Sequence, residues 1–450
     1  MTDAPPPAAS APKTSTVTFM IRALRYKNYR LFFGGQIVSL IGTWMTTTAL
    51  SWLVYRLTGS ALLLGAVGFA GQLPAFILAP VAGVLVDRGN RHHILVATQI
   101  ISMLESFALA ALTLTHRITI PSLLALTAVQ GFVNAFDMSS RQAFVIELIE
   151  NKEDLANAIA LNSSMFNLAR LIGPSVGGIL IAAVGEGWCF MIDGVSYLAV
   201  IGALLAMTIV PRVISKTKKD VVGQLREGWA YVSDSMALRS IIGLVALICL
   251  VGVPYAVLMP IFAGKILHGG PHTLGFLMAA SGTGALMAAL WMASRKTVLG
   301  LGRVIEVSSG AFGVGLIAFS FSRALWLSMI LIMGAGGAFM LQMASSNTIL
   351  QTIVDDDKRG RVLSLYIMAF MGTTPFGSLM AGSLSEKIGA PHTVLICGVL
   401  CILGSLWFHG RLPSIRAAVR PIYRKLGILP QVASGLETAS ELMGPQTPAD

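Results

Sequence analysis

Charged side chains are scarce in this chain. Asp, Glu, Lys and Arg make up 12% of its 450 residues, whereas 55% of the residues are hydrophobic. Soluble domains usually carry about 25% charged residues. With a mean hydropathy of +0.75, the composition excludes an ordinary water-soluble fold and predicts a protein that lies mostly within a lipid bilayer.

The motifs of several kinds of chemistry are also missing. The chain has neither Gly-Lys-Ser nor Gly-Lys-Thr, so it lacks a phosphate-binding loop for nucleotide hydrolysis. It has no His-Glu-x-x-His sequence and no nucleophile with a base nearby, which argues against an enzyme. All four cysteines lie in apolar runs, and the spacing of Cys397 and Cys401 fits neither a zinc site nor a redox pair. We therefore expect no metal and no cofactor.

Twelve apolar stretches are long enough to cross a bilayer, which takes a helix of about 20 residues. The predicted spans are residues 31–55, 62–86, 93–115, 120–140, 156–184, 188–210, 238–264, 272–294, 304–321, 325–349, 362–384 and 391–409. These spans predict an all-α membrane protein with twelve transmembrane helices. Because their number is even, both termini should lie on one side.

Two stretches, residues 139–198 and 345–402, repeat one another. Three glycines recur 204 positions later, so that Gly178, Gly185 and Gly194 match Gly382, Gly389 and Gly398. Duplicated helical halves are typical of secondary transporters, which bind their solute between the halves. We predict two pseudo-symmetric six-helix bundles, residues 23–210 and 238–410, with a linker at 211–237 in which 224–232 could form a short interfacial helix. Residues 1–22 should be a disordered segment and 411–450 a tail.

The basic residues are distributed unevenly between the two sides. Most of the 32 Lys and Arg residues fall in the terminal segments and in the loops on the same side, and only five fall in the opposite loops, namely Arg56, Arg117, Lys265, Arg323 and Lys387. Cytoplasmic loops retain Lys and Arg, so both termini are expected in the cytoplasm. Topology then explains the net charge of +11, so we expect no nucleic-acid partner. The expected partner is the lipid bilayer, and we expect the protein to be a monomer.

Residues 83–93, at the end of the second span, resemble the loop between helices 2 and 3 of the major facilitator superfamily. The resemblance implies a gate on the cytoplasmic side. Gly83 would allow a close helix approach, Asp87 would face a helix N-terminus, and Arg88 or Arg91 would bridge to an acid near the end of helix 4, where the chain offers Asp137. The alternative is a solvated turn that follows the positive-inside rule.

The fifth span resembles the antiporter motif of exporters in that superfamily. The matching residues are Gly173, Pro174, Gly177 and Gly178, although Ala169 stands where the motif usually has glycine. The alternative interpretation is ordinary close packing of small residues. Both interpretations require a tight helix contact here.

Longer similarities narrow the family. Residues 23–32, 42–45, 57–60 and 225–229 resemble the enterobactin-exporter-like branch, also called the transmembrane secretion effector family, and the similarity covers residues 23–409. The resemblance implies a twelve-helix carrier in the inner membrane of a bacterium. Such a carrier moves amphipathic molecules, such as siderophores or drugs, out of the cytoplasm.

A few charged residues lie inside the predicted spans, where each costs about 2.5–3.5 kcal/mol. Glu105, Arg170 and Asp193 are candidates for coupling to protons, and Arg170 could pair with Asp137 or with Glu105. A structural ion pair and a proton-coupling site would use the same residues. The sequence leaves both interpretations open.

In the superfamily, helices 1, 4, 7 and 10 line the central cavity. By this resemblance the lining residues are Gln36, Thr43, Gln130, Asn134, Tyr255, Gln342 and Asn347. This polar but uncharged set suits a bulky amphipathic solute, although each residue alone could equally bond between helices. We predict a proton-driven exporter that works by alternating access; the alternative is a facilitator-type importer or uniporter of a small polar metabolite.

Overall fold

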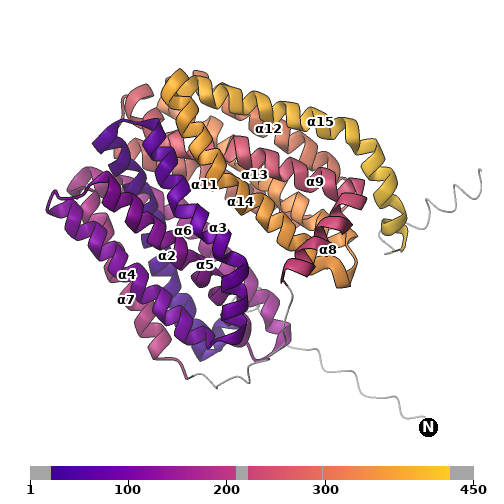
Figure 1. The fold of residues 1–450 in the computed structure, drawn as a ribbon, viewed down its shortest axis with the longest axis horizontal. Coiled ribbons are helices and arrows are strands. Elements are labelled where there is room, and N and C mark those ends of the chain that lie inside the picture. Colours follow the sequence, from indigo (N-terminus) through magenta and orange to yellow (C-terminus); the bar gives the residue numbers. More distant parts are fainter. Residues whose placement is uncertain (1–21, 209–220, 296, 426–450) are drawn as a thin grey trace, which may run out of the picture.

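The computed structural model describes residues 22–208, 221–295 and 297–425 of the chain. Within these ranges the protein is helical and contains no strand. Figure 1 shows two helical bundles that meet at one end and diverge toward the other. The predicted fold class, an all-α membrane protein built from two bundles, is confirmed.

The first bundle follows a short 3-10 helix, η1 (Arg22–Arg25), and contains six long helices. These are α2 (Lys27–Thr58), α3 (Ala61–Arg88), α4 (Arg91–Leu114), α5 (Ile120–Glu147), α6 (Lys152–Val184) and α7 (Glu186–Leu205). Side-chain caps allow the short connections between them. Ser60 accepts a hydrogen bond from Leu63 N at the start of α3, and Asn90 accepts one from His93 N at the start of α4.

The second bundle begins after helix α8 (Val221–Asp234). Its regular helices are α9 (Met236–Leu247), α11 (Pro271–Ser294), α12 (Leu301–Phe321), α13 (Leu325–Ile353), α14 (Asp356–Ile388) and α15 (Ala390–Lys425). Among the described residues, eleven helical spans are long and apolar enough to cross a membrane. α5 is not one of them, because Gln130, Asn134 and Asp137 lower its hydropathy, but with 28 residues it is long enough.

The seventh span is irregular. After α9 it continues through η2 (Ile248–Gly252), a π-helix, η3 (Val253–Leu258), a 3-10 helix, α10 (Met259–Ile261) and η4 (Phe262–Ile266), a second π-helix. Proline cannot donate a backbone hydrogen bond, and Pro254 and Pro260 both lie in this stretch. Its counterpart in the first bundle, α2, is one continuous helix of 32 residues.

The repeat glycines occupy equivalent places in the two bundles. Gly185 and Gly389 make the turns before α7 and α15, with φ angles of 89° and 85°, in a region that residues with a Cβ rarely adopt. Gly194 packs against Phe107 of α4, and Gly398 packs against the backbone of α12 at Gly313. The sequence repeat therefore corresponds to a repeat of turns and helix contacts.

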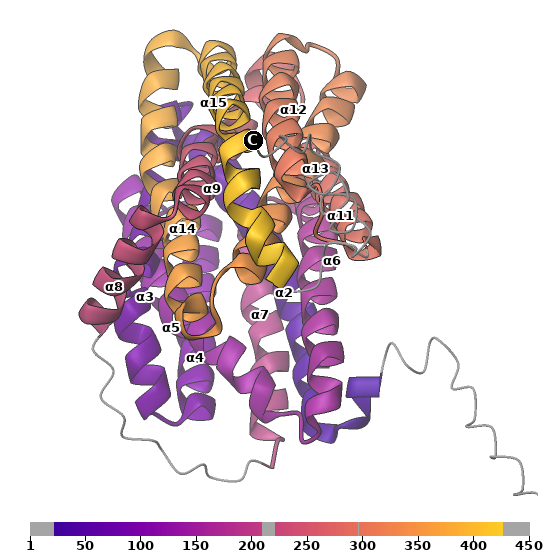
Figure 2. The same ribbon diagram turned by 90° about the vertical axis from the view of Figure 1, so that its right-hand side faces the viewer.

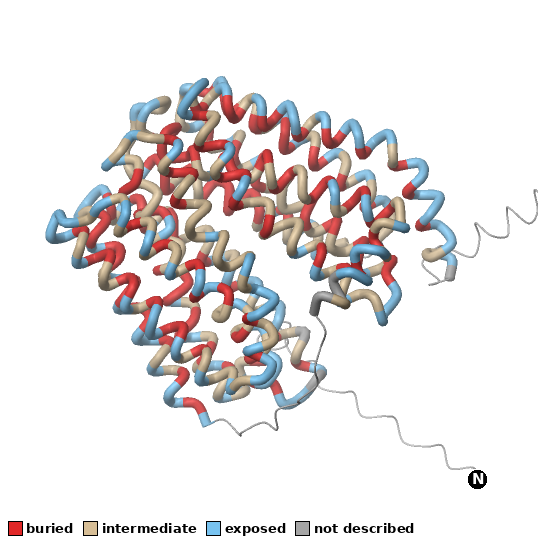
Figure 3. Tube along the Cα trace, in the orientation of Figure 1, coloured by how far each residue is buried: buried red, intermediate tan, exposed pale blue. Residues whose placement is uncertain are grey.

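The bundles touch mainly through two helix pairs, α3 with α14 and α6 with α11, and α2 adds smaller contacts with α10 and α11. We call the end that carries α8 and the first turn of α4 the linker side, and the other end the far side. The contacts begin at the far side, where Gly65 meets Gly382, and extend along α3 to Phe76, which meets Gly372. Toward the linker side the helices diverge (Figure 1), and buried residues gather inside each bundle (Figure 3).

Two segments next to the predicted bundles are helical. α8 contains the predicted interfacial helix and packs on α14, where Arg361 Nη1 lies 2.9 Å from Glu227 Oε2 and the Tyr231 hydroxyl donates to Asp355 at 3.3 Å. Helix α15 continues past the predicted end of the last span to Lys425 (Figure 2). The first part of the predicted tail is therefore helical, while the predictions for residues 1–21 and 426–450 lie outside the described residues.

Candidate functional site

An ionic cluster joins three helices at the linker side of the first bundle. Arg91, in the first turn of α4, bonds through Nη2 to Asp87 Oδ1 of α3 at 3.1 Å. Its other terminal nitrogen, Nη1, lies 2.7 Å from Glu147 Oε1 at the end of α5. The Arg91 side chain is 18% exposed, so this cluster is partly shielded from water and ties the ends of α3, α4 and α5 together.

The structure differs from the predicted gate in two details. The acid on α5 that contacts Arg91 is Glu147, ten residues beyond the predicted Asp137. Asp87 pairs with Arg91 in the first turn of α4, a helix that Asn90 caps. A Cβ added to Gly83 would meet no atom within 4 Å, so Gly83 makes no close helix contact in this conformation. Arg88 is exposed and forms no ion pair with any described residue.

Asp137 has a full set of partners inside the first bundle. Its carboxylate pairs with Arg141 one turn further along α5. It also accepts hydrogen bonds from Gln99 Nε2 at 2.6 Å and from Thr98 Oγ1 at 3.2 Å, both on α4. These bonds satisfy the charge within the bundle, so Asp137 links α4 to α5 in this conformation.

Arg170 lies apart from the acids that were its predicted partners. Its guanidinium carbon is 5.8 Å from the centre of the Trp44 ring, a cation–π distance. Within the described ranges it forms no ion pair, so neither the predicted pair with Asp137 nor the one with Glu105 is present. The rotation of each helix about its axis keeps Arg170 apart from these acids. Spacing along a sequence shows which face of a helix a residue lies on, but not which neighbouring helix that face meets.

Two buried carboxyl groups lie on α4 and α7. Asp193 is 1% exposed and accepts hydrogen bonds from Ser106 at 3.1 Å and from Ser196 at 3.5 Å. α2 passes close by, since a Cβ on Gly42 would lie 2.5 Å from Asp193 Oδ1.

Glu105 precedes Ser106 on α4 and is 7% exposed. In the described part of the chain it has no hydrogen bond and no cation, and Asp193 is near enough to act on it electrostatically. A buried carboxyl group without a counter-charge is costly when ionised. Glu105 is therefore the least satisfied of the buried acids in the bundle.

The antiporter-like residues of α6 serve two different contacts. A Cβ on Gly173 would lie 2.5 Å from Trp44 Cβ, and one on Gly177 would lie 3.2 Å from Met45 Cα, so both glycines admit α2. Pro174 and Gly178 instead face α11 of the second bundle, where a Cβ on Gly178 would lie 2.7 Å from the Pro271 carbonyl oxygen. The motif thus packs the first bundle internally and also holds it against the second.

The repeat partner of Gly178 makes the matching contact on the other side of the molecule. Gly382 of α14 faces α3, where its Cβ would lie 2.6 Å from the Ala61 carbonyl oxygen. Gly178 faces Gly275 across one bundle interface, and Gly382 faces Gly65 across the other. Two pseudo-symmetric glycine pairs therefore bring the bundles together by nearly direct backbone contact.

The residues predicted to line the cavity differ in exposure. Gln36, Tyr255 and Gln342 are buried, Thr43, Gln130 and Asn347 are half-buried, and Asn134 is exposed. Gln130 Nε2 bonds to Ser102 at 3.2 Å and to Asn134 at 3.1 Å, and the Tyr255 hydroxyl lies 3.0 Å from Ser281 Oγ. Among the described residues, no hydrogen bond joins members of this set from different helices.

The amides of Gln36 and Gln342 stand out within this set. Both are fully buried, and neither their nitrogen nor their oxygen atoms have a hydrogen-bond partner in the described ranges. An unsatisfied buried polar group costs about 1–3 kcal/mol. A ligand or an ordered water that reached these amides would remove that cost.

Three further carboxylates pair with basic side chains, and these pairs were not predicted from the sequence. Asp154 pairs with Arg22 at 2.8 Å and Arg25 at 2.6 Å. Glu186 binds Arg56 through both oxygens, at 2.7 and 3.2 Å, and Glu306 lies 2.7 Å from His409 Nδ1. Each acid lies near the end of a span, and the nearby basic residues at other span ends could have indicated these pairs.

Solved structures with the same arrangement of helices are transporters. A mutant of the nucleoside transporter NupG superposes with a TM-score of 0.69 at 12% identity, covering 87% of this chain and 99% of that one. A bacterial homologue of the human lysosomal transporter Spinster, in an inward-facing and unoccupied conformation, gives 0.68 at 14% identity, with coverages of 87% and 98%. The chain therefore shares the fold of these transporters.

The sequence relatives define the family within that class. Residues 19–437 match the transmembrane secretion effector family, and the chain belongs to it. It is 26% identical to the staphyloferrin A transporter of Staphylococcus aureus, covering 85% of this chain and 96% of the relative. It is 25% identical to the multidrug efflux pump Tap of Mycolicibacterium fortuitum and 23% identical to macrolide efflux protein A of Streptococcus pyogenes, covering 84% of this chain and 95% of each relative.

Proposed function

We propose that this transporter exports amphipathic small molecules from the bacterial cytoplasm by alternating access, with protons moving in the opposite direction. The relatives named for staphyloferrin, drug and macrolide transport support this substrate class and direction. The uneven distribution of Lys and Arg supports an orientation with both termini and the linker side in the cytoplasm, and the bacterial relatives support a location in the inner membrane.

The paired glycine contacts are the observation that carries this proposal. The bundles meet through Gly178 with Gly275 and Gly382 with Gly65, from the far side inward, while they diverge at the linker side (Figure 1). Backbone contacts between small residues let helices tilt with little side-chain repacking. Rocking about these contacts would close the linker side and open the far side around a solute held between the bundles.

In this scheme Glu105 carries the proton. Glu105 lacks a cation and a hydrogen-bond partner among the described residues, which favours its protonated form while it is buried. Asp193, held by Ser106 and Ser196, orients α4 and α7 around it. Opening toward the acidic far side would load the proton, and opening toward the cytoplasm would release it.

The Arg91 cluster is the proposed gate. In this conformation Arg91 is bound within the first bundle to Asp87 and Glu147. When the linker side closes, the loop at residues 87–91 would approach the first turns of α14, where Asp356 is exposed and Arg359 is half-buried. A disulfide between Asp87→Cys and Arg359→Cys should then stop transport, and its reduction should restore it; free transport with the disulfide intact would refute the gate.

Transport across reconstituted lipid vesicles tests the main proposal. The purified full-length protein is inserted into vesicles that have a macrolide, a dye or a siderophore inside or outside them, with and without an imposed pH difference. We expect accumulation that requires the pH difference and stops with an uncoupler. Equal, uncoupler-insensitive movement in both directions would instead establish the facilitator or uniporter, and no movement of any compound would refute small-molecule export.

A further inference from the structure

The second bundle contains a cavity of about 1050 Å³ between α11, α12 and α13. Apolar side chains form most of its wall, among them Met287, Trp291, Val307 and Ile330, and these four are 45–59% exposed on the bundle surface. Surfaces of this kind contact acyl chains in a bilayer. The cavity is therefore a groove that opens toward lipid.

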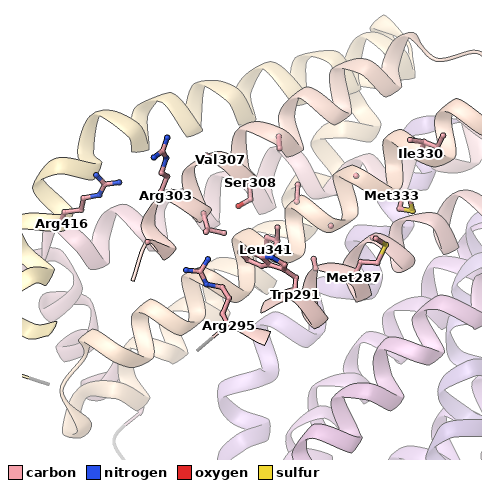
Figure 4. A pocket seen from close by; sticks show the side chains of 18 residues that line it. Met287, Trp291, Arg295, Arg303, Val307, Ser308, Ile330, Met333, Leu341 and Arg416 are labelled. Atoms are coloured by element: carbon pink, nitrogen blue, oxygen red, sulfur yellow. The ribbon is translucent and has the colours of Figure 1, made fainter. Parts of the chain in front are cut away.

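Positive charge gathers at one end of the groove. Arg295, Arg303 and Arg416, from three different parts of the chain, lie together at the linker-side end, while Met287, Ile330 and Met333 lie toward the other end (Figure 4). None of the lining residues is acidic. An anion is therefore the complementary ligand for this end.

Two of the three arginines are available to a ligand. Arg303 and Arg416 are exposed, and neither forms an ion pair with a described residue. Arg295 is held in place, because it donates to the Leu299 carbonyl oxygen at 2.7 Å and lies over the Trp291 ring at 5.1 Å.

The length of the groove fits one leaflet of a bilayer. Ile330 and Leu341, both in its wall, are separated by about 16 Å along α13, close to half of a hydrocarbon core of about 30 Å. Between them Gly334 leaves open space, since a Cβ there would meet no atom within 4 Å. The apolar wall from Leu341 to Ile330 is thus long enough for an acyl chain whose head group lies at the arginines.

We propose that this groove binds an anionic diacyl phospholipid of the linker-side leaflet. Its phosphate lies between Arg303 and Arg416, and one acyl chain runs past Gly334 toward Ile330. Basic pockets between transmembrane helices are suited to anionic head groups. A soluble anion would not contact the apolar wall of the groove, and an uncharged lipid would not pair with its arginines. This site is separate from the bundle interface and does not depend on the proposed transport.

Native mass spectrometry of the purified full-length protein tests the lipid site. The probes are dioleoylphosphatidylglycerol, dioleoylphosphatidylcholine and inorganic phosphate. We expect the protein to retain phosphatidylglycerol in preference to phosphatidylcholine. Replacing both Arg303→Gln and Arg416→Gln should weaken phosphatidylglycerol binding about tenfold or more, whereas Arg303→Lys with Arg416→Lys should keep most of it. The control, Arg226→Gln with Arg239→Gln, removes two exposed charges elsewhere on the linker side and should bind as the wild type does.

A second variant tests the acyl-chain path. Gly334→Leu fills open space in the groove and should weaken phosphatidylglycerol binding without moving a charge, while Gly202→Leu, at another glycine with open space around it, should not. Unchanged binding in the glutamine double variant, or equal binding of both lipids, would overturn the proposal. Displacement of phosphatidylglycerol by inorganic phosphate, together with normal binding in Gly334→Leu, would show a free-anion site instead and would also overturn it.

Discussion

The two bundles share their geometry but not their chemistry. In the described residues the first bundle buries four acids, Glu105, Asp154, Glu186 and Asp193, whereas the buried polar residues of the second bundle are serine, threonine and glutamine. Several of those serines bond only to their own helix, as Ser309 does to the Ile305 carbonyl oxygen at 2.7 Å. The repeat has thus kept turns and helix contacts in both halves, while the buried acids of the described residues are confined to the first.

The strongest test of this difference removes the buried acids Glu105 and Asp193 one at a time. Glu105→Gln should reduce proton-driven uptake into inverted vesicles to the level of vesicles without protein, because the side chain can no longer exchange a proton, while counterflow without a pH difference continues. Asp193→Asn should reduce proton-driven uptake less, because its amide oxygen can still accept a hydrogen bond from Ser106 or Ser196. Ser309→Ala in the second bundle is the control and should keep the proton dependence. Normal proton-driven uptake by Glu105→Gln would assign the coupling elsewhere.

The shared geometry can be tested at the repeat glycines. Gly178→Ala and Gly382→Ala each place a methyl group 2.6–2.7 Å from a carbonyl oxygen of the other bundle. Each should lower stability by about 1–3 kcal/mol and slow transport to a similar degree, as measured by thermal unfolding and vesicle uptake. Gly202→Ala, which has open space around it, should change neither. If only one of the two interface variants is affected, the contacts are not equivalent.

The side-chain contacts of Glu186 and Glu306 should also differ in strength between the bundles. Arg56→Ala leaves the buried Glu186 without its cation, which should cost about 1–3 kcal/mol. His409→Ala breaks the more exposed pair with Glu306 in the second bundle and should cost less than about 1 kcal/mol. Thermal unfolding of both variants measures the difference. The double variant Arg56→Gln with Glu186→Gln should recover part of the loss; a larger effect at His409 would contradict the comparison.

The smallest effect is expected where α8 packs on the second bundle. Partial burial, together with the nearby charge of Asp355, raises the pKa of Tyr231 above its ordinary value of about 10. The contribution of Tyr231 to packing is therefore present below pH 10 and is lost as the pH rises through the raised pKa. A dye on Ala230→Cys, in a chain whose native cysteines are buried, should report this change. Tyr231→Phe should abolish it, and the same alkaline change in that variant would assign it to another group.

Much of the fold could be predicted because it depends on local patterns. The twelve apolar stretches, the repeat of three glycines and the helix in the linker all correspond to described elements, with shifts at their ends. The extension of α15 was missed because Pro413 and Pro421 lie within it, although Leu412, Ile415 and Val419 keep a buried face on this helix.

The candidate site was harder to predict because helix rotation decides which side chains meet. Glu147 was passed over for Asp137, although both lie on α5, since only the structure shows that Arg91 lies level with the end of that helix. Arg170 was expected to pair with an acid and instead lies over Trp44. The roles proposed for these residues in gating and coupling stay predictions.

The irregular seventh span has a consequence for how the protein deforms. This span is more deeply buried than any other of the eleven apolar spans, and yet its backbone changes between α, π and 3-10 geometry four times. Deep burial therefore does not make this span stiff. Amide protons from Ile248 to Ile266 should exchange with heavy water faster than those of α2, and mechanical strain between the bundles should concentrate in this stretch.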